Sequence, residues 1–97
     1  MPSIIQETKE CFICKTRYGL QYHHVVFGAG KRQLSEREGL TVWLCREHHT
    51  GSNGVHLNHD LDLRLKQIAE KRWMEVNNKT EEDFIKIFGK NYLTIEK

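Results

Sequence analysis

The chain has 97 residues, of which 38% are hydrophobic and 29% are charged. This length predicts one domain over residues 1–97, with a core too small to bury most of the chain, so a metal or disulfide staple would add useful stability. The formal net charge of +2 is too small to indicate a nucleic-acid-binding protein by itself. No run of about 18 apolar residues occurs, so we expect no membrane partner.

The cysteine content and the first residues bear on whether the protein is intracellular or secreted. Three cysteines cannot all pair within one chain, and in an intracellular protein a close Cys-x-x-Cys pair is more often a metal site than a disulfide. The start MPSIIQETKEC has no cationic region followed by an apolar run, so a secretory leader is not expected. We therefore expect a cytoplasmic protein.

Residues 1–10 show no clear period and are expected to form a loosely ordered lead-in. Cys11 and Cys14, followed by residues 15–19, predict a knuckle turn. Two thiolates separated by two residues can reach one metal only if the backbone folds sharply between them.

The next segments predict an antiparallel hairpin. Residues 21–27 (QYHHVVF) are rich in aromatic and β-branched side chains and lead into the glycine loop 28–30, which predicts a strand and then a loop. Residues 40–45 (LTVWLC) predict the second strand, with a helical turn at 34–38 between the two. Residues 46–50 predict a short helix before a glycine-containing loop.

The second half predicts two helices. Residues 57–76 have apolar side chains near one helical face, and Asn77-Asn78 ends the segment. Residues 80–83 (TEED) resemble a capping box, with Asp in the place of Glu or Gln, and Gly89 stands where a helix-ending glycine belongs. Residues 92–95 are expected to form a docking tail or a short strand. The apolar face of the longer helix comprises Leu61, Leu65, Ile68, Ala69 and Trp73.

Four side chains have the spacing of a structural zinc site. Cys11 and Cys14 form one half, and Cys45 and His48 (CREH) form the other. Together they offer four soft or borderline ligands, the number that a tetrahedral zinc ion binds. The alternatives are that Cys11 and Cys14 are ordinary small hydrophobes or a redox pair. A reactive Cys45 thiol in a Cys/His enzyme is a further alternative, although a place between a strand and CxxH suits a metal ligand better.

Four further histidines lie in or beside the elements that this zinc would tie together: His23, His24, His49 and His56. Adjacent residues of a strand face opposite sides, so the first two can play different parts only if the strand bends or ends there. The alternative for each is a surface or core histidine satisfied by hydrogen bonds. His59, at the start of the long helix, is not expected to take part.

Together, the CxxC pair, the His23-His24 pair on a strand and the segment LCREHH (44–49) opening a helix resemble the HNH endonuclease pattern. The similarity is greatest to small phage- or prophage-encoded members, with His48 in place of the family's last cysteine, and covers residues 11–56, about half the chain. It implies an α+β, zinc-stapled ββα-metal domain, with a motif core at 11–56 and a helical part at 57–97, in a bacterial or phage-infected cell.

The resemblance also implies a role for each histidine. His23 would be a ligand of the catalytic metal and His24 the general base. His49 would bind the same metal, and His56, or else Asn53, would complete the ligand set. One departure is that no asparagine stands near Gly39 or Leu40, where the family has its central Asn, so His24 must be positioned by another group.

The function implied by the resemblance is hydrolysis of phosphodiester bonds in nucleic acid, with DNA as the expected partner. A neutral imidazole can take a proton from water near neutral pH. A divalent ion can stabilise charge on the phosphate and the leaving oxygen. Imidazole ligands suit Mn²⁺, Ni²⁺, Co²⁺ or Zn²⁺, whereas cellular supply favours Mg²⁺ or Mn²⁺.

Basic side chains near the proposed centre are candidates for phosphate contacts, with a merely solubilising role as the alternative. The rival function is a non-catalytic zinc module that binds nucleic acid or a protein partner and uses the histidines for a second structural zinc. The basic candidates are Lys31, Arg32, Arg37 and Arg46.

Overall fold

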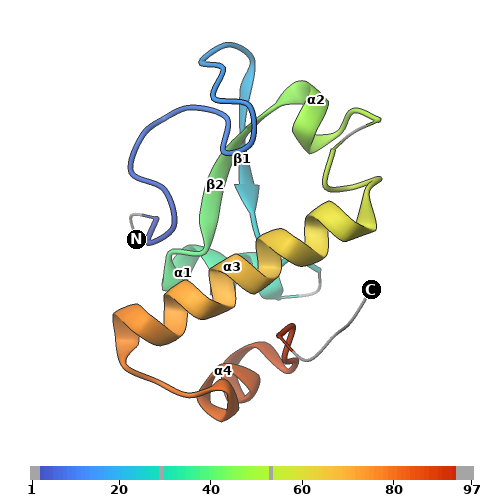
Figure 1. Cartoon of the computed structure of the whole chain (residues 1–97). Helices are drawn as coiled ribbons and strands as arrows, with labels where there is room; N and C mark the ends of the chain where they lie inside the picture. The colour runs from blue at the N-terminus through green and yellow to red at the C-terminus, as the bar shows by residue number, and fades with distance from the viewer. Residues whose placement is uncertain (1–2, 29, 53, 94–97) are drawn as a thin grey trace.

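The computed structural model describes residues 3–28, 30–52 and 54–93. These residues form a small α+β structure in which an antiparallel hairpin stands above two C-terminal helices (Figure 1). In chain order the elements are β1 (Leu20–His24), α1 (Lys31–Glu38), β2 (Thr41–Cys45), α2 (Arg46–His49), α3 (His59–Asn77) and α4 (Glu81–Phe88). The α+β class, the hairpin and the two C-terminal helices are as the sequence predicts.

The strands β1 and β2 pair antiparallel, with Leu20 opposite Cys45 and His24 opposite Thr41. The sequence-based strand of residues 21–27 was wrong at both ends, because β1 begins at Leu20 and ends at His24. Beyond the strand, the backbone N–H and carbonyl groups of Val26 both bond to the Ser35 hydroxyl instead of to a neighbouring strand. The Val25 N–H still bonds to the Leu40 carbonyl at 3.0 Å, so the chain turns away from the sheet at Val26, two residues after His24.

The segment between the strands holds a full helix, α1, where a single turn at 34–38 was expected. It begins at Lys31, so Lys31 and Arg32 lie in its first turn and not in the glycine loop, whose Ala29 is outside the described residues. Gly39 ends the helix with φ 75°, a left-handed conformation that glycine adopts without steric cost.

The described part of the N-terminal segment, residues 3–10, is packed against β2, so the expected loose lead-in is wrong there. The Ser3 hydroxyl donates to the Thr41 carbonyl, and the Gln6 side-chain oxygen accepts from the Trp43 N–H at 2.8 Å. The Ile4 N–H bonds to the Gly39 carbonyl. Polar side chains thus satisfy backbone groups of β2 that its pairing with β1 leaves open.

The long helix α3 begins at His59, two residues later than the apolar pattern predicts, because the Asn58 side chain caps it by accepting from the Leu61 N–H at 3.1 Å. Asn78 ends it in a left-handed conformation, as expected. The predicted capping box of α4 is confirmed, since Thr80 and Asp83 each accept from the other's backbone N–H.

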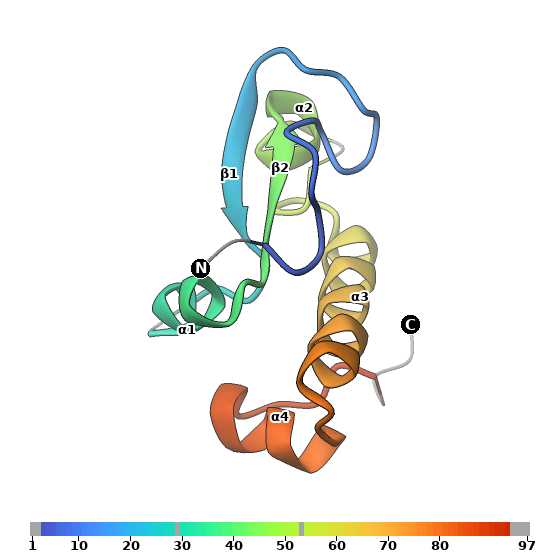
Figure 2. The same ribbon diagram turned by 90° about the vertical axis from the view of Figure 1, so that its left-hand side faces the viewer.

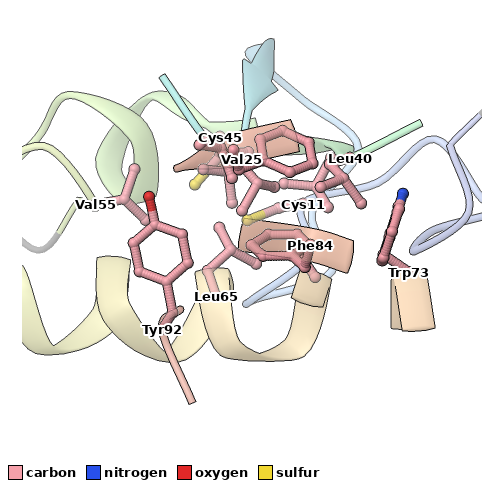
Figure 3. Packing of buried hydrophobic residues seen from close by; sticks show 14 residues of the cluster. Cys11, Val25, Leu40, Cys45, Val55, Leu65, Trp73, Phe84 and Tyr92 are labelled. Carbon is pink, nitrogen blue, oxygen red and sulfur yellow. The ribbon is translucent and has the colours of Figure 1, made fainter. Parts of the chain in front are cut away.

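The core lies between the hairpin and the two C-terminal helices (Figure 3). Leu65, Ala69 and Trp73 of α3 are buried there, but Ile68, which the helical pattern places near the same face, is 45% exposed. A charged residue takes part instead: Glu70 is completely buried, and burial raises the pKa of its carboxyl group.

The segment after α4 docks through Tyr92, whose N–H donates to Glu70 Oε1 at 2.8 Å. Tyr92 and Leu93 are not in a strand, and residues 94–95 of the expected tail lie outside the described part of the chain.

The knuckle and α2 lie at the end of the molecule opposite α4, with the hairpin between them (Figure 2). The Cα radius of gyration is 12.8 Å, close to the ~12.5 Å expected for a compact chain of this length. Among residues 3–28, 30–52 and 54–93, none of the helices combines the length and apolar character needed to cross a bilayer.

Candidate metal centres

The first candidate centre joins the knuckle to the end of β2 and the start of α2. The Sγ atoms of Cys11, Cys14 and Cys45 and a ring nitrogen of His48 all lie within 4.8 Å of one another. Two of the cysteines lie in the knuckle, and the third cysteine and the histidine lie more than 30 residues further along the chain, since Cys14 and Cys45 are separated by 31 positions. The fold therefore gathers the four residues predicted from the two half-sites.

The separations between these atoms match the edges of a tetrahedral zinc site. Zn–S bonds of ~2.3 Å and Zn–N bonds of ~2.05 Å give tetrahedral edges of roughly 3.8 Å between two sulfurs and 3.6 Å between sulfur and nitrogen. Cys14 Sγ lies 3.8 Å from Cys45 Sγ, and His48 Nδ1 lies 3.7 Å from Cys11 Sγ and 3.2 Å from Cys45 Sγ. These residues fit a structural zinc ion.

The knuckle backbone prepares Cys11 to act as a thiolate. Burial raises the pKa of the Cys11 thiol, but backbone N–H groups of Cys14, Cys45 and Ile13 outweigh burial and lower the pKa to about 6. The turn closes through the Lys15 N–H, which bonds to the Cys11 carbonyl, with Lys15 at φ 67°. A thiolate is the form that binds zinc, so the local structure agrees with a metal-binding role.

The second candidate centre is a group of three histidines from three different elements. Ring nitrogens of His23 in β1, His49 at the end of α2 and His56 in the following loop all lie within 4.8 Å of one another. The Nε2 atoms of His49 and His56 are 3.2 Å apart, which is close to the edge expected between two nitrogens ~2.1 Å from a common ion. The sequence prediction that these three side chains converge is confirmed.

The loop that carries His56 is held against α2 by its own backbone. The Val55 N–H bonds to the His48 carbonyl at 3.0 Å, and the His56 N–H points to the His49 carbonyl at 3.4 Å. Gly54 permits this close return, because a Cβ atom there would lie 2.6 Å from the His49 carbonyl oxygen. A glycine two residues before the last histidine thus positions that histidine beside His49.

The contacts of two of these histidines bear on which ring nitrogen each can offer to an ion. Gln21 Oε1 lies 2.6 Å from His49 Nδ1, and a side-chain carbonyl oxygen can only accept, so Nδ1 carries the proton and Nε2 presents a lone pair. His23 is 2% exposed, and its Nε2 has no hydrogen-bond partner within the described ranges. A buried ring nitrogen without a partner is costly unless something else satisfies it.

The electrostatics favour neutral imidazoles at this centre. Burial, assisted by the neighbouring His49 and His56, lowers the pKa of His23 to about 3. Burial and then the nearby His56 and Arg32 lower the pKa of His49. Neutral imidazole is the form that binds a metal, so these residues fit a divalent ion with nitrogen ligands.

His24 lines the same cleft as the three histidines. The cleft has a volume of about 230 Å³, and Tyr22, Phe27 and Arg32 also line it. Residues Tyr22 and His24 face one side of the strand and His23 the other, so the cleft runs across an edge of β1. Within the described residues β1 pairs only with β2. The end of the strand lets the two adjacent histidines reach one cleft.

The remaining predicted site residues are placed differently. Of the four basic candidates, Arg32 alone is among the residues that line the cleft. The Lys31 ammonium donates to the Phe88 carbonyl at the end of α4, and Arg37 Nε lies 2.9 Å from Glu38 Oε2. Arg46 is exposed in the first turn of α2. Their contacts with nucleic acid remain predictions, and Asn53 lies outside the described residues.

Sequence reasoning missed two residues that shape the second centre. Gln21 was treated only as the start of a strand, although its place two residues before His23 puts it on the same face of β1. Gly54 was treated only as a loop signal. The available clue was the glycine two residues before His56, because a residue without a Cβ atom allows two backbone segments to approach closely.

Comparisons with known proteins add no relatives: no family model, curated protein or solved structure matches the chain.

Proposed function

We propose that this chain is a metal-dependent nuclease with the ββα-metal arrangement of HNH endonucleases. It would hydrolyse phosphodiester bonds of nucleic acid, with DNA as the expected substrate, and would be stapled by a structural zinc on Cys11, Cys14, Cys45 and His48. The observation that carries the proposal is the group of three histidines whose ring nitrogens lie within 4.8 Å of one another, in a cleft that a fourth histidine, His24, also lines.

The two groups of ligands suit two different roles. The Cys₃His group offers four ligands to one ion, which leaves no open position for chemistry. The second group, His23, His49 and His56, offers only three ligands, so an ion held there would have room to bind water or a phosphate oxygen as well. A divalent ion held there would stabilise the negative charge that develops on the phosphate and the leaving oxygen.

The residues of the chain supply the other parts of hydrolysis. His24 accepts a proton from the attacking water, and Arg32 at the cleft contacts the non-bridging oxygens of the phosphate. Gln21 holds the His49 ring by its Nδ1–H, which keeps Nε2 directed to the centre. Departure of the 3′ oxygen would leave 5′-phosphate and 3′-hydroxyl ends.

The test is nicking of supercoiled plasmid by the zinc-loaded protein with added Mn²⁺, comparing His24→Ala with His59→Ala. His59 is exposed in the first turn of α3 and belongs to neither ligand group, so its variant is a matched control. We expect His24→Ala to reduce nicking by at least ~100-fold with zinc content and folding unchanged, and His59→Ala to nick as the wild type does.

The same experiment tests the rival function, a zinc module without activity. If the wild type binds a second ion but nicks no plasmid with Mg²⁺, Mn²⁺, Co²⁺, Ni²⁺ or Zn²⁺, the three histidines form a second structural site. Equal nicking by His24→Ala and wild type would instead refute the role of His24 as the base.

A further inference from the structure

A second hollow lies beside the histidine cleft, on the face of the hairpin that carries Tyr22. It has a volume of about 440 Å³, and the described residues that line it include Gln6, Lys9, Tyr22, Thr41 and Trp43. Tyr22 lines both this groove and the histidine cleft, so the two hollows adjoin at its side chain. The proposed chemistry does not use this aromatic groove.

A row of aromatic rings connects the groove to His24. Trp43 and Tyr22 stand opposite each other in the two strands, with ring centroids 5.2 Å apart. The Tyr22 centroid is in turn 5.2 Å from that of His24, with the two rings nearly perpendicular. Tyr22 keeps 40% of its surface exposed, so part of an aromatic ring is available to a ligand directly beside His24.

We propose that this aromatic groove binds a nucleobase that neighbours the scissile phosphate, and that the cleaved segment is therefore unpaired, as in a single strand or in the strand openings that negative supercoiling favours in a plasmid. The proposal rests on the proposed function for the position of the phosphate beside His24. In a duplex both faces of a base are covered by its neighbours, whereas in a single strand a base can stack on a protein ring.

The charges around the groove favour a neutral base in it, with the phosphate outside. The carboxylates of Glu7, which lines the groove, and of Glu36, which accepts from the Tyr22 hydroxyl at 2.8 Å, would repel a phosphate there. The Lys9 ammonium lies 4.5 Å from the centre of the Trp43 ring, where it can meet a phosphate of the same strand. The bond to Glu36 also holds the Tyr22 ring in place.

The first measurement is fluorescence anisotropy of a labelled single-stranded DNA oligonucleotide with the full, zinc-loaded chain and no other divalent ion. Tyr22→Leu should weaken binding by about ten-fold, the loss expected for one base stacked on a ring. Tyr22→Phe keeps the ring and should bind within about two-fold of wild type, as estimated for retained stacking. Tyr18→Leu is the matched control, because Tyr18 is 85% exposed and lies outside the groove.

The second measurement compares nucleic acids and does not depend on the folding of a variant. The wild type should bind the single strand about ten-fold more tightly than the matching duplex at equal salt. Tryptophan fluorescence should be quenched by the single strand, and Trp43→Phe should abolish that quenching, since the other tryptophan, Trp73, is only 2% exposed.

The outcomes separate this inference from the proposed nuclease activity. If plasmid is nicked but Tyr22→Leu and Tyr18→Leu bind the single strand equally, the groove proposal is overturned and the nuclease stands. If no ion supports cleavage while binding depends on Tyr22 and prefers a single strand, the groove proposal stands without the nuclease. Equal affinity for single strand and duplex, or no quenching of Trp43, also overturns it.

Discussion

Replacing Cys14 by serine is the cleanest test of the first metal centre, because Cys14 is the exposed cysteine of the three and adds little to the core. Cys11 is completely buried and Cys45 is 8% exposed, so their replacement would also disturb packing. At Cys14 the change removes one sulfur from a group in which it stands 3.8 Å from Cys45 Sγ.

The expected loss of stability is large only if the four residues hold an ion. A structural zinc supplies ~10–16 kcal/mol, whereas the whole net stability of a small domain is ~5–15 kcal/mol. Losing an outer hydrogen-bond partner of a ligand weakens metal binding by ~10–100-fold, or ~1.4–2.7 kcal/mol, so the loss of the ligand Cys14 itself should exceed ~3 kcal/mol. An ordinary surface substitution changes stability by within ~0.5 kcal/mol.

The assay is urea denaturation followed by circular dichroism, with metal content measured on the same samples and Arg17→Ser as an exposed control three residues after Cys14. We expect wild type and Arg17→Ser to carry zinc and unfold alike, and Cys14→Ser to unfold at much lower urea or to be unfolded at the start. A Cys14→Ser variant as stable as wild type would refute the metal site.

Three further predictions follow from particular contacts. Gln21→Ala removes the acceptor of the His49 Nδ1–H and should lower the affinity of the second ion by ~10–100-fold in a calorimetric titration, with the first ion unaffected; an unchanged affinity would contradict this role. Gly54→Ala places a methyl group 2.6 Å from the His49 carbonyl oxygen and should reduce plasmid nicking by roughly 100-fold at unchanged zinc content. Because burial raises the pKa of Glu70 above 4.5, the folded state binds more protons than the unfolded state just above that pH. The free energy of unfolding should therefore fall as pH rises from about 4.5 through the raised pKa, and Glu70→Gln should flatten this dependence in urea titrations at several pH values.

The elements that the sequence predicts well are those with local causes. The capping box at Thr80 and Asp83 and the glycine after α4 act within one helical turn, so residue type alone indicates them. The two halves of the Cys₃His group were equally visible, because the CxxC and CxxH spacings are themselves the geometric requirement of the site. The sequence stated an end or a bend of the strand at the His23-His24 pair only as a condition for their separate roles, and the strand predicted to reach residue 27 in fact ends at His24.

The features that were missed depend on contacts distant in sequence. The Ser35 hydroxyl ends β1 early by bonding to Val26, nine positions away. The Lys31 ammonium donates to the carbonyl of Phe88 at the end of α4, 57 positions away. The burial of Glu70 depends on the Tyr92 N–H, 22 positions away. Apolar periodicity cannot indicate such partners, since a buried polar group is tolerated only when tertiary structure supplies its hydrogen bond.

The most direct test of the nuclease proposal is the plasmid nicking rate measured as a function of divalent metal bound per chain. The protein should be inactive when only the Cys₃His group is filled, and nicking should rise in proportion as a second ion binds to His23, His49 and His56. Complete binding of the second ion without cleavage, or equal cleavage before it binds, would contradict the proposal.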